Sequence, residues 1–412
     1  MNFFSYKRNQ LYGEDVPVEK IAREVGTPLY LYSLKTLNRH FREFEMSFKK
    51  VPHITCYSVK ACSNIHILSH LKSWGSGFDI VSGGELHRVQ LIKADPKKIV
   101  FSGVGKTKEE LEAAIAYGIL LINCESGSEL TTIEKIAGER KKKIAVSLRI
   151  NPNVDAKTHM HITTGKLGNK FGIEMNEAMS LYKKYRNHPY ISLQGLACHI
   201  GSQLTSLGPL VTAIKKAKVF IEQLTIEGIH IRYLDIGGGL GITYNKENPP
   251  HPRMYGKRVC ELLADCNVTL ILEPGRVLIG NAGILVTQIL YIKKSGRKTF
   301  IIVDAGMNDL IRPSLYGSYQ EIIPIKKRHT RKIRADIVGP ICETTDIFAK
   351  DRLIDELHEG DLLAIMSSGA YGFTMSSQYN SRPRAAEVLV QVRKYSIIRK
   401  REKYADLFRQ EI

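Results

Sequence analysis

The sequence predicts an α/β protein in which a (β/α)8 TIM barrel is followed by a mostly antiparallel β domain. Between residues 53 and 272, short apolar runs recur, and each is followed by a polar or glycine-rich turn and a helical stretch. After residue 280, apolar runs follow one another with few helical stretches between them. A chain of 412 residues is long enough for a barrel of roughly 250 residues and a smaller second domain.

Eight apolar runs account for the barrel. Continuous apolar strands that alternate with helices indicate a parallel sheet covered on both faces, and eight such units are what a closed (β/α)8 barrel requires. The stretches between them, such as Leu111–Tyr117 and Leu210–Gln223, carry apolar residues at helical spacing. The expected strands are His53–Ser58, Phe78–Ser82, Ile99–Ser102, Leu120–Asn123, Ile144–Ile150, Leu193–His199, Tyr233–Ile236 and Leu270–Leu272.

The second domain is expected to be a β-sandwich or β-barrel. Leu29–Tyr32 precedes the first barrel strand and is expected to add a strand to this domain. The expected boundaries are therefore 33–281 for the barrel and 1–32 with 282–412 for the β domain. The highly charged last fifteen residues are expected to form a surface helix. The remaining expected strands are Ile284–Ile292, Phe300–Val303, Glu321–Ile325, Arg334–Val338, Leu362–Met366 and Glu387–Arg393.

Composition excludes several classes of protein. The net charge is +19, but the basic residues are spread in short clusters without interleaved aromatic residues, so we expect solvated faces and no nucleic-acid partner. The first residues lack an apolar core of signal-peptide length, and the longest apolar stretches are too short to cross a bilayer, so we expect no membrane contact. The seven scattered cysteines include no CxxC pair, which argues against a disulfide framework or zinc site and favours a cytoplasmic protein.

The chemistry is expected at the carboxyl ends of the strands, where barrel enzymes place their active sites. Five strands end in residues that can bind or react. These ends hold Lys60, then Asp79, then His199-Ile200-Gly201-Ser202, then Gly237-Gly238-Gly239-Leu240-Gly241, and finally Glu273-Pro274-Gly275-Arg276.

The last two of these loops are candidates for a phosphate site. Glycines let backbone N–H groups approach an anion closely, although glycines that only make a tight turn explain either loop alone equally well. A dinucleotide fingerprint is excluded because its third glycine would fall on Ile242. Lys60 follows an apolar strand and is expected to point into the barrel mouth, where burial can make an amine nucleophilic. A lysine opposite a phosphate loop is the arrangement that pyridoxal 5′-phosphate (PLP) needs.

Two further residues suit this cofactor. Glu273 is placed to keep a pyridine nitrogen protonated, and His199 can stack on the ring, although a strand-end histidine more often makes only a structural hydrogen bond. His159 and His161 form an HxH pair with no convincing acidic third ligand, so no metal site is assigned.

At these residues the chain resembles the alanine-racemase/ornithine-decarboxylase structural group of PLP enzymes and, within it, the diaminopimelate decarboxylases. The resemblance runs from Thr27 to about Val392, and the last two motifs are the most particular to that family. The matching motifs are Tyr57-Ser58-Val59-Lys60-Ala61, Phe78-Asp79-Ile80-Val81-Ser82-Gly83-Gly84-Glu85-Leu86, His161-Ile162-Thr163-Thr164-Gly165, Lys170-Phe171-Gly172, His199-Ile200-Gly201-Ser202-Gln203, Gly237–Gly239, Glu273-Pro274-Gly275-Arg276, Cys342-Glu343, Gly369-Ala370-Tyr371-Gly372 and Tyr379-Asn380-Ser381-Arg382-Pro383-Arg384.

The resemblance implies the conversion of meso-diaminopimelate to L-lysine by a homodimer with shared active sites. Lys60 would bind the cofactor covalently, and Cys342 would return a proton to the substrate across the dimer interface. The expected cofactor-binding residues are Lys60, Asp79, His199, Ser202, Gly237, Gly238, Gly239, Glu273, Pro274, Gly275, Arg276 and Tyr371. The expected substrate-binding residues are Arg276, Arg312, Tyr316, Glu343 and Tyr371.

Some alternatives stay open. Taken without the family, Arg312 would be an ordinary surface arginine and Cys342 a buried thiol. The chain also departs from the family pattern at Thr344-Thr345, where Ser-Gly is usual, and at Ala385-Ala386, where a proline is common. The competing hypotheses are an ornithine- or arginine-type decarboxylase or racemase of the same group, and a catalytically inactive binding protein with this fold.

Overall fold

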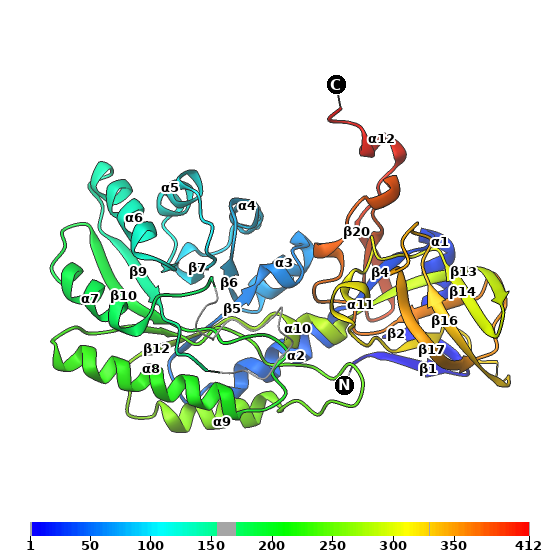
Figure 1. Cartoon of the computed structure of the whole chain (residues 1–412), viewed down its shortest axis with the longest axis horizontal. Helices are drawn as coiled ribbons and strands as arrows, with labels where there is room; N and C mark the ends of the chain where they lie inside the picture. Colours follow the sequence, from blue (N-terminus) through cyan, green and yellow to red (C-terminus); the bar gives the residue numbers. More distant parts are fainter. Residues whose placement is uncertain (1, 155–169, 329, 412) are drawn as a thin grey trace. The chain divides into compact units, whose positions relative to one another are not determined.

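The computed structural model of the chain describes residues 2–154, 170–328 and 330–411 (Figure 1). The chain divides into two compact units. We call the unit made of Phe41–Gly241 and Asn248–Gly275 the barrel unit, and the unit made of Met1–His40, Ile242–Glu247 and Arg276–Ile412 the β unit. The domain boundaries expected from the sequence, at 33 and 281, stay a prediction.

The barrel unit contains a closed barrel of parallel strands in the order β10-β11-β12-β5-β6-β7-β8-β9. Each apolar run assigned to the barrel is one of these strands, with its ends shifted by at most two residues. The fold class predicted from the sequence is thereby confirmed. The strands are β5 (His53–Ser58), β6 (Gly77–Ile80), β7 (Ile99–Phe101), β8 (Leu121–Cys124), β9 (Ile144–Arg149), β10 (Ile191–Ala197), β11 (Tyr233–Asp235) and β12 (Thr269–Leu272).

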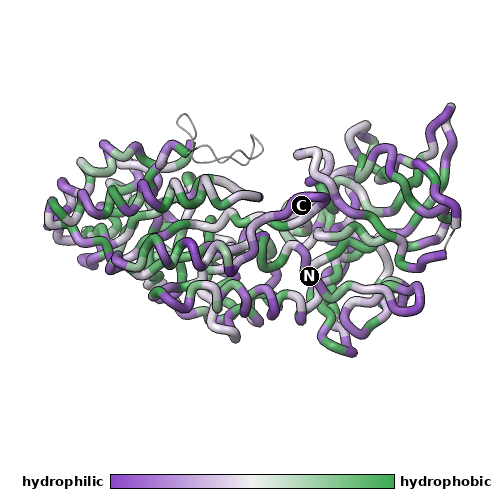
Figure 2. Tube along the Cα trace, turned by 90° about the horizontal axis from the view of Figure 1, so that it is seen from below, coloured by the Kyte–Doolittle hydropathy of each residue, from purple (hydrophilic) through white to green (hydrophobic). Residues whose placement is uncertain are grey.

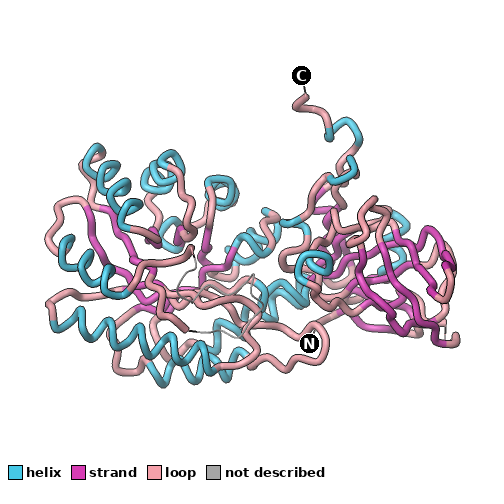
Figure 3. The backbone as a smooth tube through the Cα atoms, viewed as in Figure 1, coloured by secondary structure: helices cyan, strands magenta, loops and turns pink. Residues whose placement is uncertain are grey.

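Helices follow the barrel strands in the chain (Figure 3). The longest, α8 (Gly208–Ile226), buries Leu210, Ala213, Ile214 and Ala217, whose spacing of three and four residues forms one apolar stripe. The outer helices accordingly alternate hydrophobic and hydrophilic residues along the chain (Figure 2). The others are α3 (Ile65–Ser73), α4 (Gly83–Leu91), α5 (Lys108–Tyr117), α6 (Gly127–Glu139), α7 (Met175–Tyr185) and α9 (Pro252–Leu262), while α2 (Leu34–Ser47) passes from one unit to the other.

Serine and threonine caps set where several of these helices begin. The side chains of Ser82 and Ser126 accept hydrogen bonds from backbone N–H groups in the first turns of α4 and α6. Thr107 and Glu110 form a capping box at the start of α5. Ser82, Ser126 and Thr107 each stand directly before the first residue of their helix, so each sets where the loop that leaves the strand ends. These loops carry the polar residues at the barrel's carboxyl end.

The β unit contains a sheet in the order β17-β16-β14-β13-β4-β19-β20, with β18 joining β13 to β15. Most neighbouring strands of this sheet are antiparallel, as predicted. Two pairs, β14 with β16 and β4 with β19, are parallel. β4 pairs with β13 and β19, so the strand expected at Leu29–Tyr32 does join this unit. The strands are β4 (Leu29–Ser33), β13 (Gly283–Ser295), β14 (Lys298–Val303), β15 (Ile322–Pro324), β16 (Lys332–Val338), β17 (Ile347–Asp355), β18 (Leu362–Ile365), β19 (Ala386–Gln391) and β20 (Lys394–Arg399).

Several elements of the β unit were missed or misplaced by the sequence prediction. β17 contains Lys350-Asp351-Arg352, which interrupts its apolar pattern, and β20 is mostly exposed. A small three-stranded sheet of β1 (Phe4–Lys7), β2 (Gln10–Gly13) and β3 (Val16–Pro17) was also not predicted. The expected carboxyl-terminal surface helix is only α12 (Tyr404–Leu407), because most of the charged tail adopts no regular structure.

The core of the β unit is apolar and combines residues from the amino-terminal and carboxyl-terminal parts of the chain. Leu31 of β4 packs in one buried cluster with Val286 of β13 and Val388 of β19. Among the helices of the described ranges, none combines the length and the apolar character that a bilayer span requires.

Candidate active site

A cavity of about 340 Å³ opens in the barrel unit at the carboxyl ends of the strands. Its lining includes Lys60 after β5, His199 after β10, Gly237 after β11 and Glu273 after β12. The structure therefore brings together four of the residues that the sequence placed at strand ends.

Lys60 lies in η1 (Val59–Ala61), the short turn directly after β5. Its Nζ atom forms an ion pair with Oδ2 of Asp79, a residue of β6 with no exposed surface. Ser58 Oγ donates a hydrogen bond of 2.9 Å to the same carboxylate oxygen. The buried carboxylate therefore draws the lysine to the barrel mouth, which rules out the ordinary role of a fully solvated surface lysine.

The three glycines after β11 bring neighbouring loops into close contact. Gly237 and Gly239 have φ angles of +64° and +102°, in the left-handed region that favours glycine. A Cβ atom on Gly237 would lie 2.5 Å from His199 Nδ1, and one on Gly238 would lie 2.2 Å from the Glu273 carbonyl oxygen. Larger residues would therefore separate the loops that follow β10, β11 and β12, where phosphate binding is expected.

The neighbouring loops carry the rest of the expected phosphate site. The carbonyl of Gly239 accepts a hydrogen bond of 2.8 Å from the backbone N–H of Leu204, which ties the loop containing Ser202 to the glycine run. The carbonyl of Pro274 accepts one of 3.1 Å from Ser58 N–H, so the segment that ends with Gly275 is held beside β5.

Glu273 is buried, and its surroundings raise its affinity for a proton. Burial and the nearby carboxylates of Asp235 and Asp79 hold the pKa of Glu273 well above its usual range. Ser102 Oγ donates a hydrogen bond of 3.0 Å to Glu273 Oε1. A carboxyl group with this high proton affinity fits the task of keeping a pyridine nitrogen protonated.

His199 is neutral in this environment. Burial, followed by the positive charges of Arg149 and Lys60, lowers the pKa of His199 to about 3. An uncharged imidazole can lie flat on an aromatic ring without placing a further positive charge there. The barrel residues therefore fit PLP, with an amine for its aldehyde, a carboxyl for its ring nitrogen, an imidazole for its ring face and a glycine loop for its phosphate.

The sequence prediction missed polar residues that complete this cavity. Ser102, Asn123, Asp235 and Arg149 all line it. Each stands at the carboxyl end of a predicted barrel strand or within a residue of it. The rule that selected Lys60, a polar residue at the end of an apolar strand, would have found all four.

The β unit holds a second cluster, made of two arginines and three tyrosines. Arg276 begins α10 (Arg276–Ile279) and donates a hydrogen bond of 2.7 Å to Tyr244 Oη. Its guanidinium carbon lies 4.8 Å from the ring centre of Tyr371. Arg312 begins α11 (Arg312–Tyr316), and its guanidinium lies 5.3 Å from the ring of Tyr244 and 5.5 Å from that of Tyr316. The cluster therefore contains Arg276, Arg312, Tyr316 and Tyr371, four of the residues predicted to contact substrate.

Arg312 is not the surface arginine that composition alone would suggest. It is 6% exposed, and in the described part of the chain no carboxylate pairs with it and its Nε atom has no hydrogen-bond partner. Burial lowers the pKa of Arg312 from its usual value. A buried guanidinium without an acidic neighbour is costly to maintain, and a bound carboxylate would offset that cost.

Tyr371 has an unusual backbone. Its φ angle is +55°, which is uncommon for a bulky residue. A Cβ atom on Gly369 would lie 2.1 Å from the carbonyl oxygen of Ile279, and one on Gly372 would lie 2.4 Å from that of Ser368. The two glycines thus let the chain pack closely on either side of Tyr371.

Cys342 and Glu343 lie in the loop between β16 and β17, and both are exposed. The loop is tied to the turn at Tyr379, since Tyr379 Oη donates a hydrogen bond of 2.7 Å to Glu343 and Asn380 Oδ1 accepts one of 3.0 Å from Cys342 N–H. The Cys342 thiol is therefore exposed, whereas its residue type alone would suggest a buried thiol.

The two threonines that depart from the family pattern lie in the same exposed loop. The carbonyl of Thr345 accepts a hydrogen bond of 2.7 Å from Ser314 Oγ in α11. Behind the threonines, the buried carboxylate of Asp346 accepts backbone hydrogen bonds from Met307 and Ile341. Asp346 therefore anchors the loop beside the helix that carries Arg312.

Some of the expected residues cannot be placed. His159, His161 and the His161–Gly165 motif lie outside the described residues. In the ranges that the structure does describe, no group of three or more His, Cys, Asp or Glu side chains is arranged to hold a metal ion.

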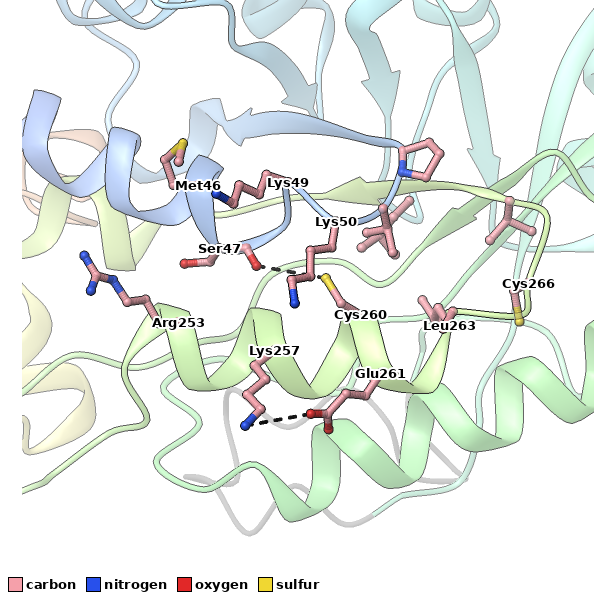
Figure 4. Close-up of a pocket in the computed structure, with 15 residues that line it drawn as sticks. Met46, Ser47, Lys49, Lys50, Arg253, Lys257, Cys260, Glu261, Leu263 and Cys266 are labelled. Carbon is pink, nitrogen blue, oxygen red and sulfur yellow. Dashed lines mark hydrogen bonds and ion pairs between the residues drawn. The ribbon is translucent and has the colours of Figure 1, made fainter.

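A larger cavity, of about 630 Å³, lies elsewhere in the barrel unit (Figure 4). It is bounded by residues that precede β5, such as Lys50 and Pro52, and by α9 residues such as Lys257 and Cys260. It therefore lies at the amino ends of the strands, and barrel enzymes act at the carboxyl ends. The smaller cavity, which contains Lys60, is the candidate active site.

Comparison with known proteins identifies the family. Residues 34–280 match the pyridoxal-binding domain of the pyridoxal-dependent decarboxylases. A diaminopimelate decarboxylase of Vibrio cholerae is 50% identical over 410 residues, which are 99% of this chain and 98% of that protein. The chain belongs to the diaminopimelate decarboxylase family. A second member, from Haemophilus influenzae, is 49% identical over 99% of both chains.

Solved structures of the family are also similar. The Helicobacter pylori diaminopimelate decarboxylase, crystallised with L-lysine, superposes with a TM-score of 0.93 at 42% identity and covers 96% of this chain and 99% of its own. The M. jannaschii enzyme, also in complex with L-lysine, gives a TM-score of 0.95 at 37% identity over 99% and 97% of the two chains. Membership of this family confirms that PLP is the cofactor of this chain and that the chain is a decarboxylase, as the sequence predicted.

Proposed function

We propose that the chain converts meso-2,6-diaminopimelate to L-lysine and carbon dioxide, the last step of lysine biosynthesis. The observation that carries this proposal is the similarity to diaminopimelate decarboxylases along the whole chain, at 50% identity in the first case. The buried position of Arg312, which has no acidic partner among the described residues, supports the particular substrate, because diaminopimelate has a second carboxylate.

The barrel unit holds and tunes the cofactor in this proposal. Lys60 would bind PLP covalently, and Asp79 would hold the lysine amine at the barrel mouth whenever it is free of the cofactor. Glu273 would hold the ring nitrogen through its carboxyl group, and the neutral imidazole of His199 would lie against the ring. When bound, PLP supplies a sink for the electron pair that remains on the α-carbon as carbon dioxide leaves.

The β unit supplies the groups that recognise substrate. Arg312 pairs with the distal carboxylate in a planar, bidentate arrangement, and Arg276 with Tyr371 contacts the cofactor and substrate. Glu343 binds the distal ammonium, and its bond to Tyr379 Oη orients the carboxylate. Cys342 then returns a proton to the α-carbon, so that L-lysine is released.

The working form is proposed to be a homodimer with shared active sites in the cytoplasm. Cys342 and Glu343 are exposed on the β unit, although their proposed tasks need a desolvated site. A partner subunit that covers this loop would supply that environment. The seven cysteines are all free thiols, as suits a reducing compartment.

The alternative substrates fit the arginine cluster less well. Ornithine and arginine have no distal carboxylate, so Arg312 would stay buried without a counter-ion in their complexes. An inactive binding protein of this fold would have no need for both Lys60 and Cys342, which are present.

Product analysis tests the proposed function. Purified protein is supplied with PLP and meso-diaminopimelate, and carbon dioxide and L-lysine are measured together. We expect equal amounts of the two products. Decarboxylation of ornithine or arginine in place of diaminopimelate would overturn the substrate, and the absence of any decarboxylation would overturn the reaction.

A further inference from the structure

Asp235 is a buried carboxylate that no expected task uses. It is 1% exposed at the end of β11. Its Oδ1 atom accepts a hydrogen bond of 2.8 Å from Gly237 N–H, and its Oδ2 atom accepts another of 2.8 Å from Asn123 Nδ2. Both carboxylate oxygens are therefore held in place.

A hydrogen-bonded bridge leads from Asp235 to Glu273. Asn123 Nδ2 also donates to Ser102 Oγ over 3.0 Å. Ser102 Oγ in turn donates to Glu273 Oε1, again over 3.0 Å. All four side chains are buried, and they come from β8, from β11 and from the residues that directly follow β7 and β12. Such a network fixes the direction in which the Glu273 carboxyl group points.

The charges around Asp235 are mostly negative or neutral. Burial raises the pKa of Asp235 to about 6, against the effect of its hydrogen bonds. Burial raises the pKa of Glu273, and the negative charge of Asp235 raises it further. The titratable groups that face this pair are the Asp79 carboxylate, the Cys56 and Cys198 thiols, the Tyr255 hydroxyl and the Lys60 amine.

We propose that Asp235 is a positioning residue that acts through Glu273, and that its buried negative charge makes Glu273 a stronger partner for the protonated ring nitrogen of bound PLP. This inference rests on the proposed function, because it requires PLP in the barrel cavity. Repulsion between two buried carboxylates raises the proton affinity of the group that can share a proton with the ring. Ser102 opposes this effect, because its hydroxyl stabilises the charged form of Glu273.

The test measures the protonation of the ring nitrogen directly. Protein loaded with PLP labelled with ¹⁵N in the ring is titrated with base, and the ¹⁵N chemical shift reports when the nitrogen loses its proton. Asp235→Asn removes the charge and nearly keeps the shape. It should lower the midpoint by about one pH unit or more, and it should lower kcat while KM for diaminopimelate stays unchanged.

Two serine variants separate electrostatics from damage to the fold. Ser102→Ala removes the donor to Glu273 and should move the midpoint upward, opposite to Asp235→Asn. Ser147 of β9 is also fully buried and has no hydrogen-bond partner in the described part of the chain, so Ser147→Ala is the matched control and should leave the midpoint unchanged. A merely structural role would move the Asp235 and Ser102 variants in the same direction.

The outcomes are distinct. Opposite shifts for the two variants support the inference. Two results overturn the inference while the proposed function stands. One is a midpoint in Asp235→Asn equal to that of the wild type, and the other is a ring nitrogen that stays protonated throughout the titration in both the wild type and Asp235→Asn. If Asp235→Asn does not fold, Ser102→Ala decides, since an unchanged midpoint in that variant also overturns the inference. Wild-type protein that binds no PLP overturns both.

Discussion

Lys60 and Asp79 form an ion pair between the turn after β5 and the adjacent strand β6. The lysine side chain is 37% exposed, whereas the carboxylate is fully buried. The pair therefore spans from the interior of the barrel to its open mouth. A lysine held in this way can reach a cofactor bound in the cavity.

Lys60→Ala should abolish turnover and the visible absorbance of the bound cofactor, because in the proposed function this amine attaches the cofactor and must be available again after each cycle. Lys98→Ala is the control. Lys98 precedes β7 at the opposite end of the barrel, and its Nζ atom donates a hydrogen bond of 3.2 Å to the Gly75 carbonyl. Near-normal activity in Lys60→Ala would remove this lysine from the chemistry.

Arg312→Ala should lower kcat/KM for meso-diaminopimelate by roughly ten- to a hundred-fold. A charge-assisted pair with the distal carboxylate contributes on the order of 1.5–3 kcal/mol. The loss should fall mainly on KM if the contact is equally strong in the ground and transition states. Steady-state kinetics measures it, and Arg334→Ala, at an exposed arginine of β16 paired with Asp351, should change neither constant. Equal kinetics for Arg312→Ala and wild type would exclude the distal-carboxylate role.

Two inactive variants should complement each other if the sites are shared between subunits. Lys60→Ala and Cys342→Ala proteins are mixed, and subunit exchange is verified by mass spectrometry. Each mixed dimer then has one site with both residues intact, so activity should recover to about a quarter of the wild-type value. No recovery after verified exchange would place the lysine and the thiol of one site on the same chain.

Asp309 should make the stability of the β unit depend on pH. Burial raises the pKa of Asp309 to about 7, and only one of its oxygens has a partner among the described residues, the Gly306 N–H. Because the folded state holds this proton more tightly than the unfolded chain, the stabilisation is fully present below about pH 4 and is lost as pH rises through 7.

Asp309→Asn should therefore stabilise the protein by about 1–3 kcal/mol at about pH 8, with little effect at about pH 5. Denaturant unfolding at both pH values measures the difference. Asp265→Asn is the control, since Asp265 is exposed and the Lys218 ammonium lowers its pKa. A gain for Asp309→Asn that is the same at both pH values would contradict a buried charge at this position.

The barrel could be predicted because each of its strands is a short, almost continuously apolar run. Parallel strands buried on both faces leave this signal in the sequence, and every run assigned to the barrel was a strand. The β unit was harder, because some of its strands are partly exposed. β17 reads as polar around Asp351, and β20 lies at a sheet edge where few residues are buried.

The candidate site was predicted where a single residue type stands out at a strand end. Lys60, His199 and Glu273 were found in this way and line one cavity. Asp235 was not selected, although it ends the apolar strand β11 and the same rule would have found it. Tyr244 was missed because its importance depends on a partner from a distant segment, Arg276. Hydrogen bonds between residues more than thirty positions apart leave no local pattern in one sequence.

The most direct measurement compares kcat/KM of the wild-type protein, loaded with PLP, for meso-diaminopimelate, L-lysine, L-ornithine and L-arginine. Arg312 and Glu343 should together select a substrate with a second amino-acid head group. We therefore predict that meso-diaminopimelate is preferred over each of the other three by at least about a hundred-fold. A preference for lysine, ornithine or arginine would contradict the proposed function and leave only a PLP-dependent decarboxylase of another specificity.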